Sequence, residues 1–132
     1  MTLLLLDTTF LIDAERSEAA VESVISDDDD VAIAAVTVAE LIVGVQLASG
    51  KHRTARRNFV GSIIDSIPTL VYDTNVAGHH AELLAAVRRS GRARGAHDLI
   101  IAATAKASER TVVTADKTAF ADLPGVEAVS HR

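Results

Sequence analysis

The sequence contains no cysteine and no tryptophan, and aromatic residues make up only 3% of it. Without cysteine, the chain cannot form disulfides, zinc–thiolate sites or a thiol nucleophile. Its hydrophobic fraction of 48% comes mostly from Ala, Val, Leu and Ile, which therefore have to supply the core. Small and branched aliphatic residues suit a parallel sheet that helices cover on both faces.

A long hydrophobic run is also missing. The longest, residues 31–39, is interrupted by Thr37 and falls far short of the roughly 20 residues that a membrane-spanning helix needs. The N-terminus lacks the basic segment and small-residue cleavage site of a secretory signal. We therefore expect a soluble, cytoplasmic protein with no membrane partner. The length of 132 residues predicts one domain, residues 1–132, with its own core.

The chain has no excess of basic residues, because 18 acidic residues outnumber 13 basic ones and the formal net charge is −5. This balance argues against a general nucleic-acid-binding protein. Eight of the basic residues nevertheless fall in two short windows, and salt limits the reach of the acidic residues elsewhere to about 10 Å, so such patches can attract phosphate. The windows are Lys51, Arg53, Arg56 and Arg57, and then Arg88, Arg89, Arg92 and Arg94.

Short apolar runs alternate with helical patterns along the chain. Strands are predicted over residues 2–6, 31–35, 69–72, 111–114 and 126–129. Helices are predicted after Asp7 and over residues 17–26, 38–48, 52–66, about 74–90, and 97–108. Thr37 and Glu40 match the capping box that starts many helices. The alternation predicts a three-layer α/β/α domain with a mostly parallel central sheet of four to five strands.

Four acidic residues in this scheme either follow a strand or lie in the first turn of a helix. The carboxyl ends of parallel strands and the helix starts above them share one edge of the sheet, so these side chains would gather there. Gathered carboxylates repel one another unless a cation lies among them. Mg²⁺ and Mn²⁺ prefer oxygen ligands, and the pattern therefore predicts a divalent-metal site. The four residues are Asp7, Glu40, Asp98 and Asp116.

Each of these acids has a purely structural alternative. Asp7 could cap the helix after the first strand, and Glu40 could be the second half of the capping box. Asp98 could be stabilised by the helix dipole, and Asp116 could be a turn residue. For any one acid alone the structural role is favoured. Their joint placement at one sheet edge is what favours the metal site.

The segments around these acids resemble the ordered motifs of the PIN-domain ribonucleases, and more narrowly those of the VapC toxins of bacterial toxin–antitoxin pairs. The resemblance extends over the whole chain. The segments are residues 5–12 (LLDTTFLI), 37–41 (TVAEL), 98–105 (DLIIAATA) and 114–116 (TAD), the last followed by Phe120.

The resemblance implies a Mg²⁺- or Mn²⁺-dependent endoribonuclease that cleaves structured RNA, tRNA or rRNA, and inhibits translation as the toxin of a pair. It makes the same four acids the metal-binding and catalytic residues, with supporting hydroxyls from Thr8, Thr9 and Thr114. It also implies an antitoxin protein as partner and a homodimer. Family members often carry Ser or Asn at the position of Thr9. Many also carry an acid at the position of Ala119, so if that acid helps hold a second metal, this chain would bind the second ion weakly.

The residue types present suit hydrolysis by a metal-activated water. No serine has a recognisable base beside it, so no covalent intermediate is expected, and the products would carry 5′-phosphate and 3′-hydroxyl ends. Arg88, Arg89, Arg92 and Arg94 lead towards the acidic site and are candidate contacts for the RNA backbone, with a solvated helix end as the alternative. For the window that starts at Lys51, an ordinary solvated helix face is favoured. His97 could touch substrate or cap its helix.

The sequence leaves two alternative functions open. A receiver-type phosphotransfer domain has a similar length, α/β layers and an acidic Mg²⁺ pocket, but it needs a pair of acids where this chain has Asp7 alone. A PIN-fold binding protein without catalytic activity is the other, and the presence of all four acids argues against it. Residues 41–48 form an apolar helical segment that could serve both the core and a contact with a dimer partner or antitoxin.

Overall fold

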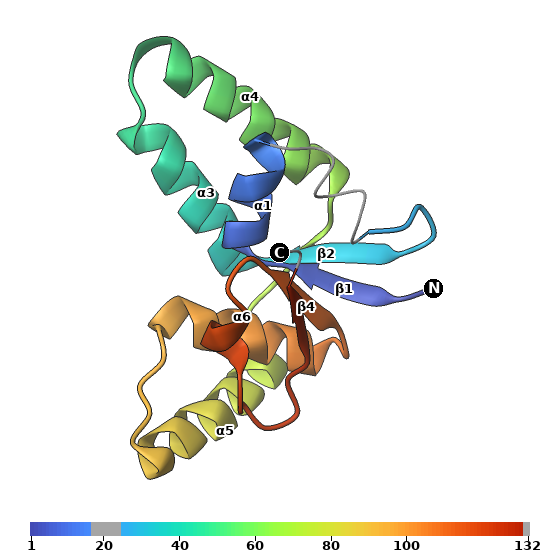
Figure 1. The fold of residues 1–132 in the computed structure, drawn as a ribbon, viewed down its shortest axis with the longest axis vertical. Helices are drawn as coiled ribbons and strands as arrows, with labels where there is room; N and C mark the ends of the chain where they lie inside the picture. Colours follow the sequence, from blue (N-terminus) through green and yellow to red (C-terminus); the bar gives the residue numbers. More distant parts are fainter. Residues whose placement is uncertain (17–24, 131–132) are drawn as a thin grey trace.

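The computed structural model describes residues 1–16 and 25–130. Its strands form one fully parallel sheet in the order β3-β2-β1-β4-β5 (Figure 1). The strands are β1 (Leu3–Leu6), β2 (Asp30–Ala34), β3 (Thr69–Leu70), β4 (Thr111–Thr114) and β5 (Ala128–Ser130). The predicted parallel sheet is confirmed, and each strand lies within two residues of its predicted bounds.

Helices cover both faces of this sheet. One layer holds α1 (Thr8–Arg16), α3 (Ala35–Leu47) and α4 (Gly50–Ser66), and the other holds α5 (Thr74–Ser90) and α6 (Ala96–Ala107) (Figure 1). A 3₁₀ helix, η1 (Lys117–Phe120), follows β4. The helix predicted over residues 17–26 falls mostly on residues 17–24, which lie outside the described residues. No described helix is long and apolar enough to cross a membrane.

The central strands are continuously apolar because both of their faces are buried. Successive side chains of a strand point to opposite faces of the sheet. Leu5 accordingly packs in the cluster beneath α5 and α6, whereas Leu4 and Leu6 pack in the cluster beneath α1, α3 and α4. Val112 and Val113 of β4 divide between the two clusters in the same way. The sequence prediction of a sheet covered on both faces is confirmed.

The predicted capping box at Thr37 is wrong. Helix α3 begins at Ala35, directly from β2, and its N-cap is Ala34 without a side-chain hydrogen bond. Thr37 lies inside the helix and is fully buried, and its hydroxyl has no hydrogen-bond partner. The strand runs straight into the helix because no turn residue separates them, so the helix starts two residues before the threonine. Glu40 is thereby left free to make contacts outside its own helix.

The run of four aspartates at residues 27–30 is only partly the solvated loop that its composition suggests. Asp30 begins β2, and its carboxylate Oδ1 lies 2.8 Å from Nη1 of Arg110. The same Nη1 donates to the backbone carbonyls of Asp30 at 2.9 Å and Leu4 at 3.2 Å. Arg110, which precedes β4, therefore ties the first part of three neighbouring strands together. The side chain of Arg110 is only 14% exposed.

Replacing Arg110 with alanine should lower the free energy of unfolding by about 1–3 kcal/mol, because two backbone carbonyls and a carboxylate lose their shared donor. The measurement is urea unfolding followed by circular dichroism. Arg57→Ala is the matched control, since Arg57 is exposed on α4 and its loss should change stability by no more than about 0.5 kcal/mol. Equal stabilities for the two variants would contradict the structural role of Arg110.

Candidate active site

Asp7 follows β1 directly and is held where the sheet meets α1. Its side chain is 3% exposed. Its carboxylate Oδ1 accepts hydrogen bonds from the backbone N–H of Phe10 at 2.9 Å and from the hydroxyl of Thr9 at 2.8 Å. Asp7 therefore does cap α1, as the structural alternative holds, and one of its oxygens is not used in these two bonds.

Glu40 reaches out of α3 to two neighbouring helices. The Thr8 hydroxyl of α1 donates to Oε1 of Glu40 at 2.6 Å, and Nδ1 of His97 lies 3.2 Å from Oε2. The glutamate carboxylate is thus engaged on both oxygens by side chains far from it in the sequence. His97 and Asp98 occupy the first turn of α6, so this contact brings Glu40 next to the third acid.

The fourth acid lies at the end of β4, in a short network of hydroxyls. Asp116 caps η1, where its Oδ1 accepts from the backbone N–H of Thr118 at 3.2 Å. The Thr114 hydroxyl accepts from the Asp116 backbone N–H at 2.9 Å, and it lies 3.3 Å from the Thr9 hydroxyl. Thr9 and Thr114 therefore connect the start of α1 with the end of β4.

Asp98 stands in the first turn of α6 and leaves almost no room beside it. A Cβ atom placed on Gly95 would lie 2.9 Å from Oδ2 of Asp98, closer than real Cβ contacts come. The absence of a side chain at position 95 is therefore needed for the observed placement of this carboxylate. The sequence shows the glycine, but nothing in it indicates that the space is taken by Asp98.

The charges of neighbouring acids reach Asp7 and Asp98. The pKa of Asp7 is raised chiefly by burial, against the lowering effect of hydrogen bonds from Thr114, Phe10 and Thr9, and the charge of Glu40 raises it further. The pKa of Asp98 is raised first by burial and then by the charges of Asp7, Glu40 and Asp116, while His97 lowers it. Asp98 therefore lies close enough to the other three acids for their charges to act on it.

The four acidic side chains do not form a closed coordination group. Among residues 1–16 and 25–130, no three Asp, Glu or His side chains converge as a ready-made metal site. Several carboxylate oxygens are instead taken by the threonine hydroxyls and by His97. The donor set itself fits a hard divalent cation, because it consists of carboxylate oxygens that repel one another. A closed group is not required, since Mg²⁺ usually keeps several waters rather than a full set of protein ligands.

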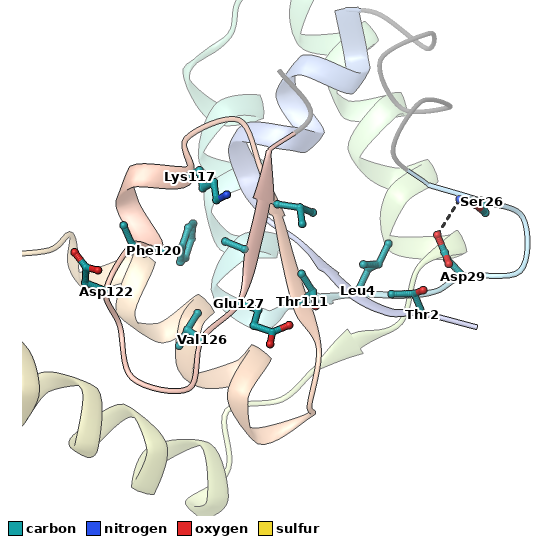
Figure 2. Close-up of a pocket in the computed structure, with 13 residues that line it drawn as sticks. Thr2, Leu4, Ser26, Asp29, Thr111, Lys117, Phe120, Asp122, Val126 and Glu127 are labelled. Atoms are coloured by element: carbon teal, nitrogen blue, oxygen red, sulfur yellow. Dashed lines mark hydrogen bonds between the residues drawn. The ribbon is translucent and has the colours of Figure 1, made fainter.

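A pocket of about 720 Å³ lies elsewhere on the molecule, and it contains none of the four acids. Figure 2 shows Lys117, Phe120 and Val126 lining one side of it, while Ser26 and Asp29 lie across the sheet on the other. The acidic edge therefore does not contribute to this pocket.

The two basic windows have partly structural roles. Arg92 pairs with Asp122 at 3.1 Å and Arg94 donates to the backbone carbonyl of Ala121 at 2.8 Å, which holds the loop before α6 against the end of η1. Arg88 and Arg89 are exposed in the last turn of α5, ahead of Gly91, whose φ of 70° favours glycine. In the other window, Arg53 donates to two carbonyls at the end of α3.

The comparisons with known proteins agree on one family. The model of the PIN domain family matches residues 4–126. Ribonuclease VapC5 of Mycobacterium tuberculosis is 36% identical over 124 residues, which cover 94% of this chain and 90% of that protein. The tRNA(fMet)-specific endonuclease VapC of Salmonella typhimurium is 31% identical over 94 residues, covering 71% and 70% of the two chains.

The solved structures point the same way. A crystal structure of VapBC-5 from Mycobacterium tuberculosis, a member of the VapBC family of toxin–antitoxin systems, matches with a TM-score of 0.81 at 30% identity and covers 98% of this chain and 99% of that one. A family match over nearly the whole chain rules out the receiver-type alternative. With the parallel sheet and the four acids in their expected order, the chain belongs to the PIN domain family, among the VapC ribonucleases.

Proposed function

We propose that the chain, as a single domain spanning residues 1–132, is a metal-dependent endoribonuclease and the toxin of a toxin–antitoxin pair. The observation that carries the proposal is the closeness of the acids: Glu40 contacts His97, the neighbour of Asp98, and the charges of Asp7, Glu40 and Asp116 raise the pKa of Asp98. Carboxylates drawn from four separate elements to one edge are costly for the fold. Such an arrangement is explained by a cation that neutralises them.

Asp7 and Asp98, with Glu40 and Asp116 beside them, would hold Mg²⁺ or Mn²⁺. When bound, such an ion lowers the pKa of a coordinated water and offsets negative charge on the phosphate. Hydrolysis of the phosphodiester at such a site would leave 5′-phosphate and 3′-hydroxyl ends. Ala119 in η1 supplies no carboxylate, so a second ion would be held weakly.

The chain's own residues orient these acids. The Phe10 N–H and the Thr9 hydroxyl fix one oxygen of Asp7. The Thr8 hydroxyl holds Glu40, and Thr114 anchors the backbone of Asp116. The threonines thus limit the freedom of the ligands before any ion arrives, which lowers the entropic cost of binding.

Structured RNA, tRNA or rRNA, is the proposed substrate, and its cleavage would inhibit translation. One relative is named as a tRNA(fMet)-specific endonuclease, which supports RNA as the substrate. Arg88 and Arg89 are exposed near the loop that leads to α6 and would contact backbone phosphates. Arg92 and Arg94 would add positive charge while holding that loop in place.

The proposed partners are an antitoxin and a second copy of the chain. The VapBC-5 structure is of a toxin–antitoxin system, which supports the antitoxin. Helix α3 exposes Ile42, Val43 and Leu47, and Leu47 is 82% exposed. Apolar side chains left on one helix are typical of a surface that a protein partner covers.

The test of the proposed function is cleavage of total cellular RNA by purified protein, with EDTA, Mg²⁺ or Mn²⁺, and with the Asp7→Asn variant alongside. Fragments that require the metal and vanish in the variant are the expected result, and mapping their ends identifies the RNA and the 5′-phosphate. Intact RNA in every lane, from folded protein free of antitoxin, would instead indicate a PIN-fold binding protein without catalytic activity.

Metal affinity should weaken on acidification sooner than it would at a site of ordinary carboxylates. The pKa values of Asp7 and Asp98 are raised, so both acids take up protons at a higher pH than usual and compete with the ion. Mn²⁺ titrations between about pH 4 and pH 8 measure this. Asp65→Asn, at an exposed acid of α4, should leave the affinity unchanged. An affinity that begins to fall only near the ordinary carboxylate pKa of 3.8 would count against the raised pKa values.

A further inference from the structure

The Glu40 carboxylate is the point where three helices meet through side chains. Thr8 of α1 donates to one oxygen at 2.6 Å, and His97 of α6 lies 3.2 Å from the other. Glu40 itself comes from α3, and its side chain is 28% exposed. The sequence separation of these partners means that only the assembled fold can bring them together.

Glu40 needs such support because its own helix does not provide it. A glutamate side chain has several rotatable bonds and loses considerable freedom when it is held in one position. The capping box that would have fixed it is absent, since α3 starts at Ala35 and Thr37 is buried one turn away without a partner. The contacts to Thr8 and His97 are therefore what holds this carboxylate in place.

The two nitrogens of His97 have different surroundings. Nδ1 is the atom near Glu40, so it must carry a hydrogen in order to donate to the carboxylate. Nε2 has no hydrogen-bond partner among the described residues, and the side chain is 58% exposed. Any role of His97 that works through Glu40 therefore depends on Nδ1, whereas a direct role towards a substrate would depend on Nε2.

We propose that His97 is a positioning residue, whose Nδ1–H fixes the Glu40 carboxylate against Asp98 at the acidic edge. This inference rests on the proposed nuclease function for its kinetic consequence, but the contact itself exists without it. Side chains that orient a metal-binding carboxylate typically change affinity or activity by about 10- to 100-fold when removed. His97 would act in this way from the helix that also carries Asp98.

The kinetic test uses three substitutions of His97 and one control substitution, with bulk tRNA as substrate in Mn²⁺. His97→Ala should lower kcat by about 10- to 100-fold with little change in KM, because the substrate contacts stay in place. His97→Asn should recover most of the loss, since its amide nitrogen can take the place of Nδ1. His97→Gln should not recover it, because its amide nitrogen takes the place of Nε2. His52→Ala, at an exposed histidine of α4, should behave as wild type.

Recovery by His97→Gln instead of His97→Asn would overturn the proposal in favour of a direct role for Nε2. Wild-type activity of His97→Ala would show that His97 has no role in cleavage.

A second readout does not depend on cleavage. Proton–nitrogen correlation spectra of the metal-free protein should show the His97 hydrogen on Nδ1, and Glu40→Ala should abolish that preference. A hydrogen on Nε2 in the wild type overturns the proposal even if the protein cleaves no RNA, and a hydrogen on Nδ1 sustains the contact in that case.

Discussion

Asp98→Asn is expected to lower RNA cleavage by about 100-fold or more while leaving the fold at least as stable as wild type. The loss of activity follows because an amide cannot replace a carboxylate in holding a divalent ion. The gain in stability follows because Asp98 is half-buried among three like charges, which raise its pKa together with burial. Removing its charge relieves that repulsion, so function and stability should change in opposite directions.

The pH dependence of stability provides the check. A carboxylate with a raised pKa in the folded state destabilises the fold as pH rises from its unfolded value of 3.8 through the folded value, and the penalty persists at neutral pH. Thermal unfolding without metal should therefore show a smaller loss of stability over this range in Asp98→Asn than in wild type. Asp65→Asn is the control, and it should retain both the activity and the pH profile of wild type. A variant clearly less stable than wild type at neutral pH would refute the repulsion.

Leu5→Ala is expected to lower the free energy of unfolding by about 2–5 kcal/mol. Leu5 lies in the central strand, is 0% exposed, and packs under α5 and α6 with Leu83 and Leu99. The substitution removes three methyl or methylene groups from a close-packed site whose neighbours on the sheet cannot collapse into the space. A loss of this size is a large share of the stability of an ordinary domain.

Urea unfolding of Leu5→Ala beside Leu47→Ala, at protein concentrations low enough to keep the chain monomeric, measures this effect. The two substitutions remove the same atoms, but Leu47 is 82% exposed on α3, so its loss should change stability by no more than about 0.5 kcal/mol. The difference between them isolates burial from the chemistry of the substitution. Comparable effects in the two variants would mean that the core does not lie where the structure places it.

The sequence by itself determined the layers of the fold and the identity of the acids. Strands buried on both faces must be apolar at every position, and Leu3–Leu6 and Thr111–Thr114 show that pattern almost without interruption. Helix ends were predictable where the capping residue is local. Asp73 accepts from the N–H of Val76 to start α5, and Gly91 ends it in the left-handed region. Such features depend on residues only a few positions apart.

Only the tertiary structure decided how the acids are held. Thr37 and Glu40 match a capping box in sequence, but β2 enters α3 two residues earlier, and Glu40 turns to Thr8 and His97 instead. The aspartate run at residues 27–30 likewise has the composition of an acidic loop, and only the packed strands bring Asp30 to Arg110. A local sequence pattern indicates the hydrophobic periodicity and the capping residues of its own helix or strand. Contacts between residues far apart in the chain depend on how whole elements pack, and this packing places the site.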